Sequence, residues 1–124
     1  MTKTKIIDYE FKRGDTAFLE KFRPNDLNGI PLTLSADDNI YFTMKQEADG
    51  QAILKKKINN GITYEEDGYF HITLEPQDTA NLSAETYKYD IELVLQSFEP
   101  TYVKTLIEGE ITLLQDITKE GDRV

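Results

Sequence analysis

Cysteine is absent from this 124-residue chain, and this absence removes several kinds of chemistry at once. There can be no disulfide, zinc ribbon, iron–sulfur cluster or thiol nucleophile, and the composition is compatible with a reducing compartment. The fold must therefore be stabilised by packing. At 124 residues, with 39% hydrophobic residues, the chain has the size and composition of a single domain with its own core.

Long apolar runs are also missing. No stretch approaches the roughly 20 consecutive apolar residues that a membrane-spanning helix needs. The N-terminal segment, residues 1–8, reaches an acid directly after Ile6 and Ile7, so it lacks the apolar centre of a secretory signal. We expect a soluble protein, folded in a cytoplasm and without a membrane partner.

Positive charge is scarce. Lys and Arg number 14 against 23 Asp and Glu, which gives a net charge of −9 and a field that repels phosphate backbones. The one basic cluster is Lys55–Lys57, and on a strand its side chains would project to alternate faces. We interpret it as a solvated edge that discourages edge-to-edge pairing, and we expect no nucleic-acid partner.

The usual motifs of catalysis and cofactor binding are absent as well. There is no glycine-rich phosphate loop and no Gly-x-Ser-x-Gly elbow, and no pair of carboxylates is singled out by its spacing. The only histidine, His71, falls on the wet side of a predicted strand, which indicates a surface residue. We therefore expect no enzyme activity and no cofactor.

Acidic loops are the one source of hard oxygen ligands. They lie at Asp37–Asp38, Asp49 and Glu65–Asp67, but none has the alternating spacing and downstream glutamate of a dedicated calcium loop. We interpret them as solvated loops and expect no metal site. Weak calcium binding where two such loops meet stays open as an alternative.

What the chain does have is two-residue periodicity, clearest from Tyr87 to Leu95. Apolar residues occupy every second position there, while Lys88, Asp90 and Glu92 alternate with them. This pattern predicts a β-strand with one buried and one solvated face, as in an antiparallel sheet.

Similar patterns recur along the chain between turn signals such as Asp49-Gly50. They predict strands at residues 6–11, 17–22, 40–46, 51–58, 62–64, 69–75, 87–95 and 102–114, the last with Val103, Ile107, Ile111 and Leu113 on one face. Pro76 predicts a single helical turn after the sixth strand. The fold class is all-β, an immunoglobulin-like antiparallel β-sandwich of about seven to eight strands with one short helical turn. We expect one domain over residues 1–118 and a flexible tail over residues 119–124.

Three tyrosines are candidate structural or contact residues. Tyr87 opens its strand just after a turn, which predicts a tyrosine corner whose hydroxyl bonds back to that turn. Tyr41 and Tyr102 are candidates for exposed aromatic contacts. The triplet Arg13-Gly14-Asp15 spells a cell-adhesion motif, but we interpret its Gly-Asp as a turn.

A series of short landmarks follows one another along the chain, and their order carries more information than any one of them. The landmarks are residues Arg13–Thr16, Asp26–Leu34, Ile40–Lys45, Gly68–Ile72, Glu75–Thr79, Leu82–Ile91 and Val103–Ile111. The succession resembles the N-terminal immunoglobulin-like domain of upper-baseplate proteins and related small structural proteins of phages and prophages of Gram-positive bacteria. The resemblance extends from about Phe11 to Thr118.

This resemblance implies a virion structural or adaptor protein, a component of baseplate, neck or head fibre. Its partners would be other virion proteins and further copies of itself, and it would reside in the bacterial host cytoplasm during assembly and then in the virion. No small-molecule ligand is expected. The alternative is a carbohydrate- or receptor-binding β-sandwich module, calcium-assisted, that uses Tyr41 and Tyr102 in one flat patch beside Asp37 and Asp38.

Overall fold

The computed structural model describes residues 4–26 and 28–124, and within them the fold is all-β, as predicted. The strands are β1 (Lys5–Ile6), β2 (Tyr9–Lys12), β3 (Ala17–Phe18), β4 (Asn39–Lys45), β5 (Ala52–Ile58), β6 (Gly61–Tyr64), β7 (Phe70–Leu74), β8 (Thr86–Leu95) and β9 (Tyr102–Leu114). The predicted helical turn is α1 (Pro76–Thr79), and a 3-10 turn, η1 (Glu120–Asp122), lies near the C-terminus.

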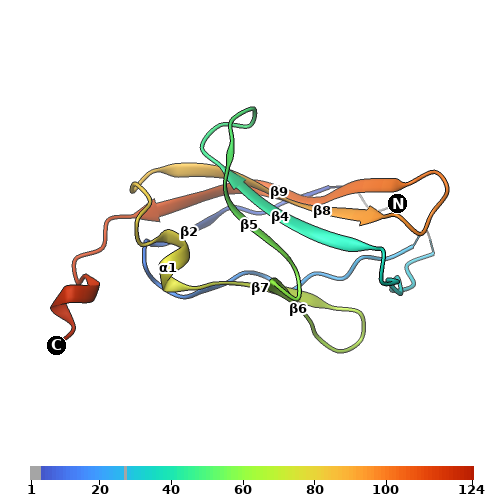
Figure 1. The fold of residues 1–124 in the computed structure, drawn as a ribbon, viewed down its shortest axis with the longest axis horizontal. Helices are drawn as coiled ribbons and strands as arrows, with labels where there is room; N and C mark the ends of the chain where they lie inside the picture. Colours follow the sequence, from blue (N-terminus) through green and yellow to red (C-terminus); the bar gives the residue numbers. More distant parts are fainter. Residues whose placement is uncertain (1–3, 27) are drawn as a thin grey trace.

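The strands form one hydrogen-bonded path in the order β1-β9-β8-β4-β5-β6-β7-β3, and β2 also pairs with β9. In Figure 1 this path is folded over into two layers. The layer with β4, β8 and β9 lies above the layer with β6 and β7, and β5 passes from one to the other. The buried side chains lie between the two layers.

The sheet is mixed, which corrects the prediction of antiparallel pairing throughout. Both N-terminal strands run parallel to β9, and β5 runs parallel to β6 where it enters the second layer. The other pairs are antiparallel. The predicted strand at residues 17–22 is also shorter than expected, because after β3 the pairing continues only through a bond from the Leu19 amide to the Ile72 carbonyl and an isolated bridge between Phe22 and Phe70.

The N-terminal strand predicted at residues 6–11 is broken in two at Ile7 and Asp8. The Ile7 carbonyl approaches Gly109 of β9 so closely that a Cβ atom there would overlap it. The same carbonyl accepts a hydrogen bond from the Tyr89 hydroxyl at 2.7 Å, and Asp8 Oδ1 accepts one from the Glu110 amide at 2.9 Å. A glycine inside a strand pattern predicts a bulge or a close backbone approach, and the structure has the close approach at Gly109.

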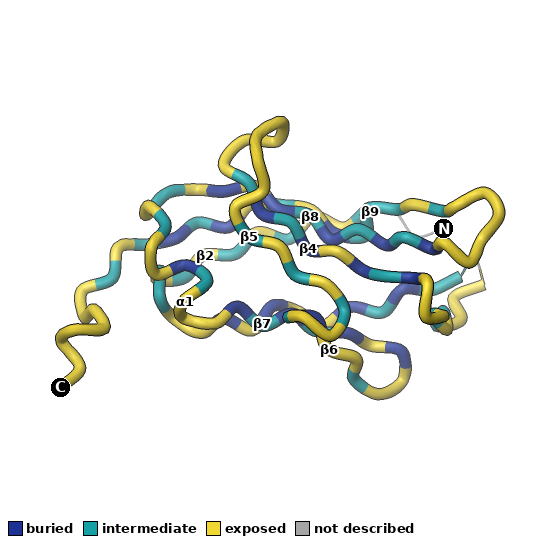
Figure 2. Tube along the Cα trace, viewed as in Figure 1, coloured by how far each residue is buried: buried dark blue, intermediate teal, exposed yellow. Residues whose placement is uncertain are grey.

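Period-two alternation places the core as expected. In β8, Tyr87, Tyr89, Ile91, Leu93 and Leu95 are all buried, and they face Ile40, Phe42 and Met44 of β4 on the same side of the sheet. Figure 2 shows the buried positions of β4, β8 and β9 alternating with exposed or half-buried ones, and exposed residues dominating the loops.

Val103 is an exception, because it is 54% exposed although its parity predicted burial. The register explains the difference. Ile91 pairs with Ile107, but the next residue, Glu92, pairs with Thr105, so Leu106 is an extra residue in β9. Such a bulge reverses which face each preceding residue occupies, and Val103 is therefore turned outward.

The two layers are also joined by an ion pair. Lys56 Nζ of β5 lies 2.8 Å from the Asp78 carboxylate in α1, and both side chains are largely shielded from solvent. The same carboxylate accepts a hydrogen bond from the Glu75 amide at the start of the turn. Beyond β9, Asp116 is held 2.8 Å from Arg13, and the C-terminal segment then leads away from the body of the molecule (Figure 1).

Candidate functional site

The described part of the chain brings together no group of three His, Asp or Glu side chains able to hold a metal ion. His71 is half-buried, and its Nδ1 faces Glu65, whose other oxygen lies 3.1 Å from Lys21. The hydrogen bond from Lys21, followed by the charges of Lys21 and His71, lowers the pKa of Glu65 against the effect of desolvation. This arrangement is a surface ion-pair cluster.

Asp38, a candidate ligand of the acidic loops, has a structural role. It is buried, and its two oxygens accept hydrogen bonds from the amide and hydroxyl groups of Ser35 and Ser97 at 2.9–3.1 Å. Desolvation alone would raise the pKa of Asp38, but these bonds outweigh it and lower the pKa to about 2. Its carboxylate ties the connection before β4 to the loop after β8.

The tyrosines proposed as surface contacts do not form one patch. Tyr41 pairs with Glu92 and Lys57 and points outward from the sheet. Tyr102 pairs with buried Leu95, so it shares the inward face, and its ring packs against Phe98 at a centroid distance of 6.2 Å. The flat aromatic patch on which the sugar-binding alternative depends is therefore not present.

Tyr87 lies at the mouth of β8, where a tyrosine corner was predicted. It is 3% exposed, and its hydroxyl donates to the Ser83 carbonyl at 2.8 Å, four residues upstream. Burial, followed by the charge of Glu85, raises the pKa of this phenol. The bond fastens the turn after α1 to the start of the longest regular strand pair.

Tyr87→Phe should lower the free energy of unfolding by about 1 kcal/mol, because the hydrogen bond from its hydroxyl to the Ser83 carbonyl is lost. Urea denaturation measures the difference. Tyr41→Phe is the matched control, since no hydrogen bond of its hydroxyl is present among the described residues. Equal unfolding midpoints for the two variants would show that the corner contributes nothing.

The triplet at Arg13-Gly14-Asp15 forms a turn, as interpreted from the sequence. Gly14 has φ +82°, and the Asp15 amide donates to the Lys12 carbonyl at 3.2 Å. Arg13 is bound to Asp116 and to the Leu82 carbonyl. The guanidinium is thus engaged within the molecule.

A broad charged surface is the outward face of β5, β4, β8 and β9, which we call the outer face. Strand register arranges its side chains in rows across the four strands. One row contains Lys55, Thr43, Asp90 and Glu108, and a neighbouring row contains Lys57, Tyr41 and Glu92. In these two rows lysines occupy β5 and carboxylates occupy β8 and β9, whereas the next row places Lys45 on β4, Lys88 on β8 and Glu110 on β9.

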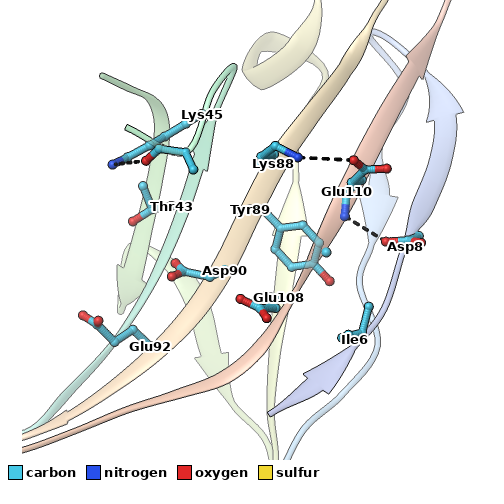
Figure 3. Close-up of a pocket in the computed structure, with 12 residues that line it drawn as sticks. Ile6, Asp8, Thr43, Lys45, Lys88, Tyr89, Asp90, Glu92, Glu108 and Glu110 are labelled. Atoms are coloured by element: carbon cyan, nitrogen blue, oxygen red, sulfur yellow. Dashed lines mark hydrogen bonds and ion pairs between the residues drawn. The ribbon is translucent and has the colours of Figure 1, made fainter. Parts of the chain in front are cut away.

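Figure 3 shows the centre of the outer face, a shallow depression of about 650 Å³ in which Asp90, Glu92 and Glu108 lie near one another. Lys88 makes a 3.4 Å ion pair with Glu110 at one end of it. Burial, followed by the charges of Glu92 and Glu108, raises the pKa of Asp90. The carboxylates of β8 and β9 therefore remain incompletely neutralised, and this half of the face favours cationic groups.

Sequence parity predicted that Asp90 and Glu92 face water, but it could not show the separation of charge across the outer face. That separation depends on which strands are neighbours. The lysine cluster illustrates the same point: Lys55 and Lys57 are exposed as expected, whereas Lys56 turns inward to Asp78. No local sequence signal marks Asp78 as its partner.

No protein-family model matches the chain, and no curated protein matches its sequence. Among the described residues, no helix combines the length and apolar character that crossing a membrane requires.

Proposed function

We propose that this protein is a structural or adaptor protein of a phage or prophage particle, acting through protein–protein contacts rather than by catalysis. It would be made in the bacterial host cytoplasm and then built into the virion as a baseplate, neck or head-fibre component. The observation that carries the proposal is the succession of sequence landmarks together with the strand order in which they are arranged.

That strand order supports an immunoglobulin-like domain. The neighbours β5-β4-β8-β9 correspond in sequence and position to strands C′, C, F and G of a variable-type immunoglobulin sheet, and β3-β7-β6 correspond to B, E and D. A tyrosine corner belongs at the start of strand F, where Tyr87 lies. A resemblance at the level of fold is an analogy, so function must be argued from a surface.

The outer face supplies that surface, and the charges of the row from Lys55 to Glu108 fit a second copy of the same chain. In a two-fold symmetric pair each patch meets itself. A two-fold axis parallel to the strands, between β4 and β8, places the β5 edge of one copy over β9 of the other. Lys55 of one copy would then face Glu108 of its partner, with half-exposed Tyr41 near the centre.

Charge reversal tests this arrangement in solution. Lys55→Glu and Glu108→Lys should each weaken self-association by about tenfold or more, because like charges then face each other across the axis. A mixture of the two variants should recover wild-type affinity, since opposite charges meet again at both contacts. Sedimentation velocity over a concentration series measures all three dissociation constants.

Two controls accompany this experiment. Glu99→Lys changes net charge as Glu108→Lys does but lies in the exposed loop before β9, so it should associate like wild type. Raising the ionic strength to about 1 M, where the Debye length is about 3 Å, should weaken wild-type association. A strictly monomeric wild-type protein, or a mixture no tighter than the single variants, would contradict pairing through the outer face.

The particle assignment has a separate test. Genes on either side should encode tail, portal or capsid proteins, and the protein should be present in purified particles by mass spectrometry. Its absence from particles released by the host would contradict the virion proposal even if the chain self-associates.

A further inference from the structure

A groove of about 400 Å³ opens where the two ends of the strand path face each other, and we call it the edge groove. One wall is β1 and the first half of β9, and the other is the segment that follows β3 together with Tyr69. Leu93, Leu106 and Ile107 supply an apolar floor. The edge groove shares none of these residues with the charged rows of the outer face.

The edge groove is lined mainly by positive charge, whereas the molecule as a whole is negatively charged. Lys5, Lys21, Arg23 and Lys104 line the groove, against one carboxylate, Glu20. Such a concentration of cations is unexpected in a chain of net charge −9. A cleft lined by one sign of charge focuses the field and attracts ligands of the opposite sign.

Two of these cations have no carboxylate partner within the described part of the chain. Lys5 lies 3.5 Å from Glu20 and Lys21 lies 3.1 Å from Glu65, whereas Arg23 and Lys104 have no carboxylate within 4.0 Å among the described residues. Residues 1–3 and 27, outside the described part, are Met, Thr, Lys and Leu and carry no side-chain carboxylate. Lys104 Nζ donates to Thr4 Oγ1 at 3.3 Å, which leaves its other N–H groups and the guanidinium of Arg23 available to an anion from outside the chain.

Arg23 is held in place for such a contact. Its guanidinium carbon lies 5.2 Å from the centre of the Tyr69 ring, a cation–π geometry that orients the planar group. Its Nε is buried and has no hydrogen-bond partner in the described part of the chain, and the same holds for Oδ1 of Asn25 beside it. Buried polar atoms are normally paired, so this unpaired donor and acceptor show that the wall of the groove around Arg23 and Asn25 is not fully satisfied by the chain itself.

We propose that the edge groove binds an acidic, extended segment of a partner protein. A carboxylate of that segment sits on Arg23 and Lys104, which together offer a planar donor fork and a point charge. An apolar side chain of the segment covers Leu106. A simple inorganic anion would satisfy Arg23 but would leave the apolar floor uncovered.

This site goes beyond the assembly role of the outer face, and it gives the domain a second contact surface with different chemistry. The outer face accommodates a copy of the same chain, whereas the edge groove selects a carboxylate flanked by apolar groups.

The test uses the acetylated, amidated peptide Leu-Glu-Leu-Glu-Leu as the ligand. Its binding to the full chain is monitored by two-dimensional ¹H–¹⁵N NMR. We expect saturable shifts of groove amides and of the Arg23 Nε–H resonance. Arg23→Gln and Lys104→Gln should each weaken binding by about tenfold or more. Arg123→Gln, an exposed arginine outside the groove, is the matched control and should bind like wild type.

Two further ligands identify what the groove recognises. The isosteric peptide Leu-Gln-Leu-Gln-Leu should bind at least about tenfold more weakly, and pentanoate should bind more weakly than the acidic peptide. Equal binding of the glutamine peptide, equal binding of pentanoate, or no groove shifts with the acidic peptide would each overturn the proposal. Lys104→Gln keeps the test decisive if Arg23→Gln fails to fold, and outer-face variants should leave peptide binding unchanged.

Discussion

Gly109→Ala should destabilise the protein by about 3–5 kcal/mol. The added Cβ would overlap the Ile7 carbonyl and lie 2.9 Å from Asp8 Oδ1. Overpacking of this kind costs about 1–3 kcal/mol, and the strain falls on backbone atoms that cannot move without breaking other contacts. The hydrogen bonds of Tyr89 to Ile7 and of Glu110 to Asp8 would be lost as well, at about 1 kcal/mol each.

Guanidinium denaturation measures this loss, and Gly121→Ala is the matched control. Nothing lies within 4 Å of a Cβ atom at Gly121, so its midpoint should equal that of wild type. Amide hydrogen exchange shows which part of the structure is destabilised. In the Gly109 variant, protection from exchange should fall first in β1 and β2. An unchanged midpoint would mean that the N-terminal segment does not contact β9 in this way.

Asp38→Ala should lower the free energy of unfolding by about 2–4 kcal/mol, because the amides and hydroxyls of Ser35 and Ser97 would lose their charged acceptor together. Asp37→Ala, its exposed neighbour, should have little effect and serves as control. Thermal denaturation at neutral pH compares the stabilities of the two variants. Equal stability of both variants would show that the two loops are held by other contacts.

The lowered pKa of Asp38 also predicts how the free energy of unfolding changes with pH in the acidic range. Its folded-state pKa of about 2 lies below the ordinary value of 3.8, so the folded state binds its proton less readily than the unfolded state. Its contribution is therefore complete above about pH 5 and is lost as the pH falls towards 2. In Asp38→Asn, the slope of unfolding free energy against pH should be shallower across this interval, and an unchanged slope would contradict the assignment.

The alternating strands could be predicted because each follows from local chemistry. In β8, the alternation of apolar and polar residues was sufficient to place Tyr89, Ile91 and Leu93 on the buried face of the strand. The turn signal Asp49-Gly50 likewise marks the boundary between two alternating segments, and the strands there, β4 and β5, are antiparallel neighbours. The all-β class follows from these elements together.

The failures share a different physical origin. The parallel pairing of β1 and β2 with β9 joins segments about as far apart in sequence as the chain allows, and no turn chemistry specifies it. Val103 was misplaced because one extra residue at Leu106 reverses the face, and apolar periodicity does not reveal a bulge. Predictions from local pattern fail where register is set by a distant partner.

The candidate sites follow the same division. Sequence could identify Tyr87 because the turn and the strand that define its surroundings are adjacent in the chain. It could not identify the edge groove, since Arg23 and Asn25 lie in an irregular segment while Lys104 is far along the chain. The separation of charge on the outer face likewise appears only after four strands are placed in register.

The parallel pairing of the first and last strands has a mechanical consequence. A load applied through the residues before β1 and after β9 would pull two parallel neighbours in opposite directions along their length. The hydrogen bonds between them would then be loaded in shear and would have to break together, whereas the bonds of a hairpin pulled at its open end break in succession. Resistance to such a load is governed by the unfolding rate. This geometry would let the domain resist a load applied between its two ends.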